Sequence, residues 1–366
     1  MPERGAAPNV HPVIRRVLNA AGALSSPLLP DDYLEMINPL WSTRELRGRI
    51  QRVQKETKDA STILIKPGYR WPGHRPGQYV RIGLDIDGVR HWRAYSLTSD
   101  PFREDGLISI TPKVVDAGKV SPYLVRNAGP GTIVTLSDVE GDFVLPEPIP
   151  EKLLFISAGS GVTPIMSMLR HLDHDDRLRD VVHLHSARYT DEVIFGPELR
   201  RLAERNEGFR LHEQMTGQQG RIGPADLDRL CPDWRQRETF ISGPSEMLDA
   251  FSDHWEQRSD CEQLHMERFQ PKLGLGGGAE GEGGKIRFLK SDAEAESDGS
   301  KPILVAGEDA GLELPYGCRE GICHTCVCEL VSGRVRDLRN GEVYGQEGEM
   351  IRTCISAPEG PIELDV

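Results

Sequence analysis

Four cysteines near the C-terminal end of this 366-residue chain have a spacing that suits metal chemistry. Cys318, Cys323 and Cys326 lie in the run CREGICHTC, with four and then two residues between them, and Cys354 follows in RTCIS. The pattern C-x4-C-x2-C…C is one by which four thiolates hold a two-iron, two-sulfur cluster. It predicts a one-electron carrier in this part of the chain.

Other uses of cysteine fit this spacing less well. Disulfide frameworks are typical of small secreted chains, whereas five of the seven cysteines here crowd into the end of a long chain. Structural zinc usually requires two C-x2-C pairs, and one is present. Cys328, Cys231 and Cys261 match no ligand spacing, and we expect them to be small buried hydrophobic residues.

A second group of residues suits a flavin. In RAYSLTSDP, Arg93 can pair with a phosphate, Tyr95 can lie against the flavin ring, and Ser96 can form a hydrogen bond near the reactive nitrogen. Leu97 completes this motif at the end of an expected strand. The alternatives are a packed barrel aromatic for Tyr95 and an exposed strand residue for Arg93.

The flavin prediction gains support from a turn downstream. The run GKVS, from Gly118 through Val120 to Ser121, resembles the entry to a helix. Backbone N–H groups and a hydroxyl at such an entry can hold a second phosphate region. Because both motifs occur in one chain, we favour a flavin site.

A glycine turn at ISAGSGVTP predicts a place for a pyrophosphate. Gly159 and Gly161 lie between an expected strand and an expected helix, followed by Thr163 and Pro164. The N–H groups and the positive end of such a helix attract anions. Pro164 departs from the G-x-G-x-x-G fingerprint but suits a first helical turn. Taken alone, the run could equally be a purely structural turn.

Short β-rich runs and helical runs divide the chain into domains. The runs TILIK, GQYVRIGL, HWRAYSLTS, GLISITPKVV and TIVTLS, separated by Gly and Pro, predict an antiparallel β-barrel in residues 46–150. In residues 151–272, KLLFIS, VVHLHS, FRLHEQM and TFISG alternate with the helical runs PIMSMLRHL, PELRRLAER and SEMLDAFSDHW. This alternation predicts a parallel sheet covered on both faces. A Gly-rich linker, 273–284, then separates residues 285–366.

Charge and hydropathy exclude some classes of protein. The net charge is −13, with no basic cluster, so we expect no nucleic-acid partner. Residues 285–366 hold 9 Lys and Arg against 16 Asp and Glu, and such an acidic surface would attract a basic partner.

No apolar stretch approaches the ~20 residues needed to span a bilayer. Arg15 and Arg16 could begin a twin-arginine signal, but polar residues interrupt its apolar part, so we expect a cytoplasmic protein.

Residues 1–45 form a separate extension that we expect to be helical. Val13, Ile14, Val17, Leu18 and Ala21 recur at helical intervals, and LPDDYLEMINPLW supplies another apolar face. We expect the extension to pack on the barrel as additional core. The alternative is a docking surface for a membrane or a partner protein.

The order of these motifs resembles the ferredoxin–NADP reductase superfamily over residues 46–366. After R-x-Y-S, G-x-x-S and G-x-G-x-T-P come Ser242-Gly243-Pro244 and the element Glu267-Arg268-Phe269. The chain is most similar to the fused type that ends in a plant-type ferredoxin domain. The resemblance implies an FAD-binding antiparallel barrel, an α/β nicotinamide domain with a parallel sheet, and an α+β β-grasp domain that carries the cluster.

The resemblance also implies roles for individual residues. Ser96 would support the flavin nitrogen N5, while Glu267 and Phe269 would border the stacked nicotinamide and flavin rings. Gly243 and Pro244 would form the turn beside the nicotinamide, where several members have Cys in place of Ser242.

The coenzyme type would be decided near the second strand of the α/β domain. There the resemblance places Ser186 and Arg188 beside the adenosine ribose. A cation and a hydroxyl favour a 2′-phosphate, so we expect NADPH, with NADH as the alternative. Arg188 could also be an ordinary surface arginine.

These expectations define an enzyme that moves electrons from NADPH through FAD to its own cluster and then, singly, to an acceptor protein. The segment SPLLPDDYLEMINPLWSTRELRG resembles reductases that serve membrane acyl-CoA desaturases. We therefore expect such a desaturase as the acceptor, with peripheral membrane contact through that partner. The alternatives are an oxygenase acting on aromatic, steroid or other substrates, and a non-enzymatic iron–sulfur sensor.

Overall fold

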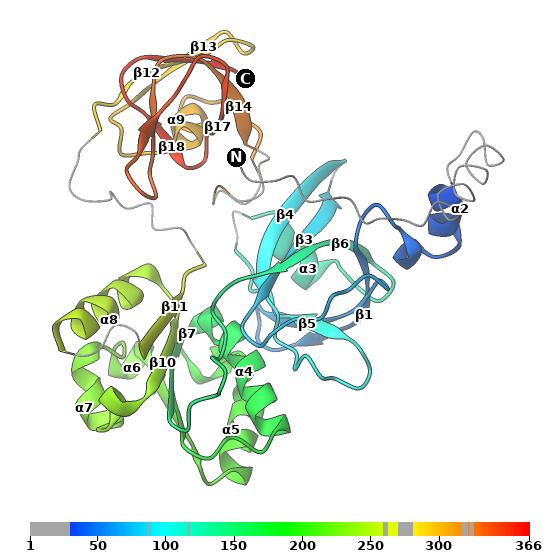
Figure 1. The fold of residues 1–366 in the computed structure, drawn as a ribbon, viewed down its shortest axis with the longest axis vertical. Helices are drawn as coiled ribbons and strands as arrows, with labels where there is room; N and C mark the ends of the chain where they lie inside the picture. The colour runs from blue at the N-terminus through cyan, green and yellow to red at the C-terminus, as the bar shows by residue number, and fades with distance from the viewer. Residues whose placement is uncertain are drawn as a thin grey trace.

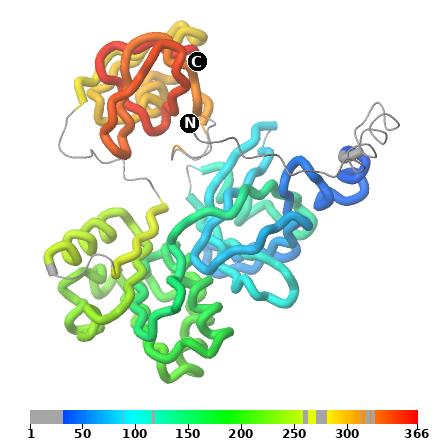
Figure 2. Tube along the Cα trace, in the orientation of Figure 1, coloured from blue at the N-terminus to red at the C-terminus, as the bar shows by residue number. Residues whose placement is uncertain are grey.

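The computed structural model describes residues 30–86, 88–115, 118–258, 263–269, 281–312, 314–316, 321 and 326–366. Three bodies follow one another along the chain, as the colour sequence in Figure 2 shows. The first is a β-barrel, the second an α/β domain and the third a small mixed domain at the C-terminal end (Figure 1).

The first body is the expected antiparallel barrel. Its strands are β1 Arg47–Lys55, β2 Ser61–Pro67, β3 Tyr79–Ile86, β4 Val89–Ser96, β5 Ile108–Ile110 and β6 Ile133–Glu140, in the order β4-β3-β6-β1-β2-β5. A bridge between Leu97 and Ile110 joins the two outer strands and closes the barrel. The interior consists of Ile, Leu and Val side chains, and the short helix α3, Val120–Arg126, adds Val120 and Leu124 to it.

Two strands of the barrel differ from the sequence-based expectation. GLISITPKVV forms only the three-residue strand β5, because Pro112 has no N–H to continue the ladder, although Pro112, Lys113 and Val114 still contact residues 59–61. The strand β1, RGRIQRVQK, was not expected. Its many polar side chains conceal a strand that pairs with β2 and β6 and buries Ile50.

The second body is a five-stranded parallel sheet in the order β11-β10-β7-β8-β9. Its strands are β7 Leu153–Ala158, β8 Val181–Ala187, β9 Phe209–Met215, β10 Glu238–Ser242 and β11 Leu264–Glu267. The helices are α4 Val162–His174, α5 Gly196–Arg205, α6 Thr216–Gln219, α7 Leu227–Leu230 and α8 Ser245–Arg258, with 3-10 turns η2 Gly159–Gly161, η3 Thr190–Glu192, η4 Pro224–Asp226 and η5 Trp234–Gln236. The expected alternation of strands and helices is confirmed.

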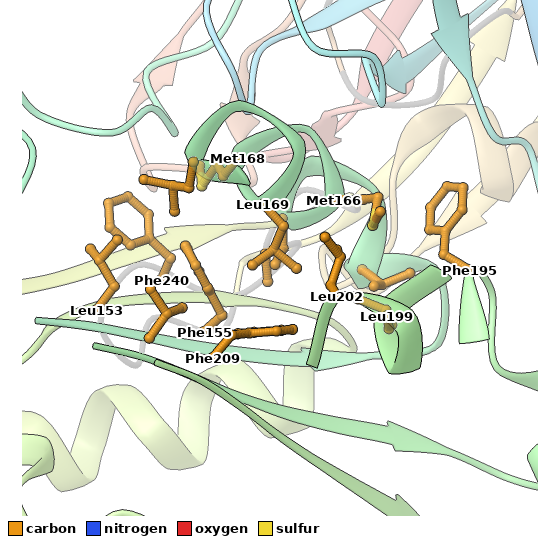
Figure 3. Close-up of a cluster of buried hydrophobic side chains, with 14 of the residues drawn as sticks. Leu153, Phe155, Met166, Met168, Leu169, Phe195, Leu199, Leu202, Phe209 and Phe240 are labelled. Atoms are coloured by element: carbon orange, nitrogen blue, oxygen red, sulfur yellow. The ribbon is translucent and has the colours of Figure 1, made fainter. Parts of the chain in front are cut away.

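The two faces of this sheet bury separate hydrophobic clusters. Figure 3 shows one face, where Met166, Met168 and Leu169 of α4 lie over Phe155 and Phe240. The other face packs against η5 and α8 and includes the buried Cys231, as expected for that cysteine. Three residues from the first body, Ala60, Phe143 and Leu145, belong to the α4 cluster, so the barrel and the α/β domain share a core.

The third body has a mixed five-stranded sheet in the order β13-β12-β19-β14-β17 and a three-stranded sheet β16-β15-β18. The elements are β12 Gly284–Phe288, β13 Ala293–Ser297, α9 Ile303–Asp309, β14 Val327–Ser332, β15 Val335–Asp337, β16 Val343–Tyr344, β17 Glu349–Arg352, β18 Ser356–Pro358 and β19 Ile362–Asp365. The central pair, β12 and β19, is parallel, while β13, β14 and β17 join in antiparallel fashion. Ile303 and Leu304 of α9 are buried in the core of this domain.

The described part of the N-terminal extension does not pack as additional core. It consists of α2, Pro30–Ile37, and η1, Pro39–Trp41, where Met36 and Ile37 are 76% and 72% exposed and Trp41 is also exposed. Polar side chains of this segment contact the first strand of the barrel instead: Glu35 pairs with Arg47 at 2.9 Å, and Asn38 accepts from Arg49 at 3.0 Å. The expectation of buried packing is therefore wrong for residues 30–41, and the segment 1–29 lies outside the described residues.

Among the described residues, no helix is both long enough and apolar enough to cross a membrane.

Candidate functional site

The carboxyl ends of the parallel strands define one edge of the α/β sheet. β7, β8, β10 and β11 all end there, which brings Ala158, Ser186, Ser242 and Glu267 to neighbouring positions on the sheet. In open parallel sheets, ligands bind outside this edge.

The glycine turn after β7 is shaped by close backbone packing. Gly159 has φ +54°, a conformation that side-chain-bearing residues rarely adopt. A Cβ at Gly161 would lie 2.0 Å from the carbonyl oxygen of Ser242, so a glycine is needed for α4 to begin this close to β10. Thr163 donates its hydroxyl to the Ser160 carbonyl at 2.8 Å, and Pro164 lies in the first turn of α4. The positive end of this 13-residue helix therefore begins at the sheet edge, where a pyrophosphate fits.

Two buried hydroxyls at the same edge lack a protein partner among the described residues. Ser242 is fully buried and Ser186 is 5% exposed, and neither Oγ has a hydrogen-bond partner. Buried polar atoms are normally hydrogen-bonded, so orphaned hydroxyls at a ligand-binding edge fit a nucleotide that supplies the missing partners. Gly243 follows Ser242 at a crowded position, since a Cβ there would lie 2.5 Å from Cε of Met247 and 3.3 Å from Cβ of Ala158, and Pro244 then leads into α8.

Arg188 follows β8 directly and is exposed. Its guanidinium carbon lies 5.4 Å from the ring centre of Tyr189, and its carbonyl accepts a hydrogen bond from the Gly217 amide at 3.1 Å. The backbone of Arg188 is therefore fixed while its charged end remains at the surface, two residues beyond the orphaned hydroxyl of Ser186.

A buried polar row, which the sequence did not reveal, crosses the sheet just inside this edge. The Ser157 hydroxyl lies 2.8 Å from Nε2 of His183 and 2.7 Å from Nδ1 of His185, and all three side chains are fully buried. Burial lowers the pKa of His185 to about 4, and burial together with His185 lowers the pKa of His183 well below its usual value. Both imidazoles are therefore neutral near pH 7.

The flavin motif lies on β4, at the strand end nearest the α/β domain. Arg93 and Tyr95 are paired with Ile82 and Val80 of β3, so they share the barrel's inner face with buried aliphatic side chains. Burial raises the pKa of Tyr95, which keeps its phenol neutral. Ser96 is buried at the end of the strand, and Leu97 donates its amide to the Gln78 carbonyl at 2.8 Å.

The expected phosphate turn before α3 is closed by its own hydrogen bonds. The Gly118 amide donates to the Val115 carbonyl at 2.8 Å, and the Val115 amide donates to Oγ of Ser121 at 3.1 Å. Val120 is buried in the barrel core. Ser121 thus stabilises the turn, and its hydroxyl proton remains available for an oxygen of a ligand.

Electrostatics link the two sides of the site. Tyr79, the strand partner of Ser96, donates its hydroxyl to Glu140 at 3.2 Å, and Glu140 is also paired with Arg81. Burial raises the pKa of Tyr79 to about 12, with Glu140 adding to the effect and Glu267 of β11 making a smaller contribution. The carboxylate of Glu267 therefore acts on a tyrosine beside the flavin motif. Phe269, two residues later, is 36% exposed.

The third domain brings two of the predicted cluster ligands together. The Sγ atoms of Cys326 and Cys354 are 3.1 Å apart, well beyond a disulfide bond of about 2.05 Å, and both residues are 2% exposed. The Gly321 amide donates to Cys354 Sγ at 3.2 Å, a contact that stabilises a thiolate. Two buried sulfurs with an amide donor fit an iron–sulfur cluster, and Cys318 and Cys323 lie outside the described residues.

Cys328, expected to be a non-ligand, is buried, and burial raises the pKa of its thiol to about 12.

Three family descriptions match successive parts of the chain. Residues 64–144 match an oxidoreductase FAD-binding domain, residues 155–253 an oxidoreductase NAD-binding domain and residues 288–359 a 2Fe-2S iron-sulfur cluster binding domain. Together with the barrel, the parallel sheet and the paired cysteines, these matches define an NAD(P)H-dependent oxidoreductase that uses FAD and a 2Fe-2S cluster. The chain belongs to the ferredoxin–NADP reductase family, in the form that carries a C-terminal ferredoxin domain.

Relatives extend this assignment over nearly the whole chain. An NADPH oxidoreductase of Mycobacterium tuberculosis is 44% identical over 359 residues, which cover 97% of this chain and 93% of the relative. The glycine betaine monooxygenase reductase subunit of Chromohalobacter salexigens is 29% identical over 89% of this chain and 96% of its own length. The solved structure of phthalate dioxygenase reductase shares the fold, with a TM-score of 0.57, 20% identity, and coverage of 88% of this chain and 98% of that structure.

Proposed function

We propose that this protein is an NADPH-dependent reductase that passes electrons one at a time to a separate acceptor protein. The observation that carries the proposal is the contact between α4, the helix that begins at the dinucleotide-binding turn, and the loop that continues from the flavin motif, in a chain that also pairs two buried cysteines. Bound FAD supplies the step from two-electron hydride chemistry to one-electron transfer. The protein's own residues bind and orient the reacting groups.

On the flavin side, Arg93 would pair with the FAD phosphates and Tyr95 would lie along the ring. Ser96 would donate its hydroxyl to the flavin nitrogen that receives hydride. Gly118 and Ser121 would hold the second phosphate region. These roles agree with the positions of all five residues on β4 and at the entry to α3.

On the coenzyme side, the turn from Gly159 to Gly161, with Thr163 and Pro164, would bind the pyrophosphate. Ser242 would offer its orphaned hydroxyl to the nicotinamide end, beside Gly243 and Pro244. Glu267 and Phe269 would border the stacked rings and exclude water from them.

We propose NADPH as the preferred coenzyme. Ser186 and Arg188 lie at the end of β8, where the orphaned hydroxyl and the exposed guanidinium would receive the 2′-phosphate. The relative that is 44% identical is named an NADPH oxidoreductase, which supports this choice. Steady-state kcat/KM with NADPH and with NADH tests it, and a higher value with NADH would contradict it.

We propose that the acceptor is a membrane fatty acyl-CoA desaturase. Two observations support this: residues 26–48 resemble desaturase reductases, and within them α2 and η1 turn large apolar side chains away from the barrel. Such a surface suits contact with a membrane-bound partner and the adjoining bilayer.

The second candidate acceptor is an oxygenase component, which the name of the Chromohalobacter relative favours. Reconstitution separates the two candidates. The purified reductase would be combined with desaturase-containing membranes and an acyl-CoA, or with a soluble oxygenase component and its substrate, and NADPH consumption would be compared with product formed. Stoichiometric coupling to the desaturase alone supports our proposal, and coupling to the oxygenase alone replaces it.

A further inference from the structure

One stripe of α4 faces the loop that follows the flavin motif. Ser167, Arg170, His171 and His174 are spaced i, i+3, i+4 and i+7, so they lie along one side of the helix. They contact residues 98–100, which begin two positions after Ser96 on β4.

The innermost contacts of this stripe are hydrogen bonds to the backbone of the loop. Ser167 donates its hydroxyl to the Ser99 carbonyl at 2.7 Å, and both residues are fully buried. Arg170 donates from Nη1 to the Thr98 carbonyl at 2.5 Å. Its Nε and Nη2 form a fork with Glu198 of α5 at 2.9 and 2.7 Å, which fixes the direction of the guanidinium.

The outer contacts of the stripe converge on Asp100. Its carboxylate lies 3.6 Å from Nδ1 of His171 and 3.2 Å from Nδ1 of His174. The Phe102 ring, two residues along the loop, lies over both imidazoles at centroid distances of 5.6 and 6.4 Å. The loop is therefore in contact with α4 over about two helical turns.

An apolar contact from the same helix supports the attachment. A Cβ at Gly77, in the segment before β3, would lie 2.5 Å from Cε of Met168 and 2.0 Å from the Phe143 carbonyl oxygen. The Phe143 carbonyl oxygen is what restricts position 77 to glycine, and the Met168 contact places a side chain of α4 against this segment of the barrel.

The geometry points to α4 as the element that sets the distance between coenzyme and flavin. Its first turn follows the Gly159–Gly161 turn, and its stripe holds the loop that continues from Ser96. We propose that Ser167, Arg170, His171 and His174, acting on residues 98–100 as an α4 clamp, are positioning residues for hydride transfer. None of them is assigned a contact with coenzyme, flavin or acceptor, so the clamp acts in the same way whichever acceptor is used.

The proposal predicts that the clamp affects the rate of hydride transfer and not the binding of the coenzyme. A displacement of about 1 Å between reacting groups can slow a reaction about a hundredfold. Loosening the clamp should therefore lower kcat for the reduction, by NADPH, of a dye that takes its electrons directly from the flavin. The coenzyme-binding turn itself would be intact, so KM for NADPH should change little.

Arg170→Met tests the clamp against a matched control. Arg200→Met removes a similar fork, from Arg200 of α5 to Glu213 of β9 at 2.8 and 3.0 Å, that lies wholly within the α/β domain. In the full-length protein we expect backbone amides of residues 97–102 to exchange hydrogen about tenfold faster in Arg170→Met than in the control. We also expect Arg170→Met to lower kcat for dye reduction about tenfold or more, with KM for NADPH within about twofold of the wild type. Arg170→Lys should restore part of the lost kcat.

The proposal would be overturned if residues 97–102 exchanged hydrogen at the same rate in Arg170→Met and Arg200→Met. It would also be overturned if Arg170→Met raised KM for NADPH and left kcat unchanged. Ser167→Ala provides a second variant in case Arg170→Met does not fold. It removes one buried hydrogen bond and no charge. It should likewise speed hydrogen exchange in residues 97–102 and lower kcat while leaving KM for NADPH nearly unchanged.

Discussion

Two cysteines of the third domain that are far apart in the sequence lie close together in the structure. Cys326 and Cys354 approach each other although 27 residues separate them along the chain, because β14 and β17 pair and place the start of one beside the end of the other. Cys328 lies two residues from Cys326 and is buried in the same core, so burial does not distinguish the two thiols. The C-x4-C-x2-C…C spacing does, and it is the basis for expecting iron at Cys326 and not at Cys328.

Cys326→Ser should separate the two electron-transfer activities. Reduction of a flavin-accepting dye by NADPH should stay within about twofold of the wild type, while reduction of cytochrome c should fall about a hundredfold because the one-electron outlet is lost. Steady-state assays with the dye and with cytochrome c measure the two activities. Cys328→Ala, as the control, should retain both activities, and a parallel loss of both in Cys326→Ser would refute this division of roles.

Arg188 decides the choice of coenzyme in our proposal. Arg188→Leu should lower kcat/KM for NADPH by about thirtyfold, because a charge-assisted contact to the 2′-phosphate is lost. The value for NADH should remain within about twofold. Arg201→Leu on α5 offers a control that removes a surface guanidinium elsewhere in the same domain. An equal loss of kcat/KM with both coenzymes would show that Arg188 does not bind the 2′-phosphate of NADPH.

Neighbouring strands create features that no short stretch of sequence announces. Ser157 and His185 occupy one rung of the sheet, opposite each other on β7 and β8, and His183 lies two residues before His185 on the same face. The glycine turn and the alternation of strands and helices were predictable because they are local patterns. The polar row was not, because it depends on register, and the outward face of α2 was not, because an apolar stripe in the sequence ordinarily faces a core.

The buried histidines should make the α/β domain sensitive to acid. Their pKa values are lowered in the folded state, so below about pH 6.5 the unfolded chain binds protons that the folded chain does not, and stability falls as the pH falls. For His185 alone the loss should be on the order of 2 kcal/mol at pH 5. Urea unfolding between about pH 7.5 and about pH 5 measures the slope.

The matched variants for this measurement are His185→Asn and His212→Asn. Asparagine at 185 can still reach Ser157 but does not titrate, so it should flatten the pH dependence even if the protein is less stable throughout. His212 is half-buried on β9, outside this polar row, and its replacement is the control for removing an imidazole from another strand of the same sheet. A wild-type slope in His185→Asn would contradict the explanation.

The close approach of α4 to β10 gives a further test. Gly161→Ala would place a methyl group 2.0 Å from the Ser242 carbonyl oxygen, so the start of α4 or the end of β10 must move. We expect a loss of stability of about 2 kcal/mol or more and a higher KM for NADPH, because the pyrophosphate turn moves with the helix. Thermal unfolding and steady-state kinetics measure the two effects. The control is Gly220→Ala, where a Cβ would meet no atom within 4 Å, although its positive φ still carries some strain.

The molecule as a whole is acidic, and the cluster-bearing domain contributes strongly to that charge. Its residues 285–366 carry 16 acidic against 9 basic side chains. The reaction with a basic acceptor should therefore slow as salt screens the attraction, while reduction of a neutral dye at the flavin should not. The rate of cytochrome c reduction between about 20 and 300 mM NaCl tests this. A rate that is independent of salt would exclude electrostatic attraction as the guide to docking.

The hydroxyl of Ser157 carries a single proton yet touches two imidazoles. It can give that proton to His183 or to His185 but not to both, so it must accept an N–H from the ring to which it does not donate. The two neutral rings are then the same tautomer: both carry hydrogen on Nδ1 when the hydroxyl donates to Nε2 of His183, and both carry it on Nε2 when the hydroxyl donates to Nδ1 of His185. Moving the hydroxyl proton from one ring to the other would require both imidazoles to exchange tautomers together, which makes the interior of this sheet a two-position proton lock.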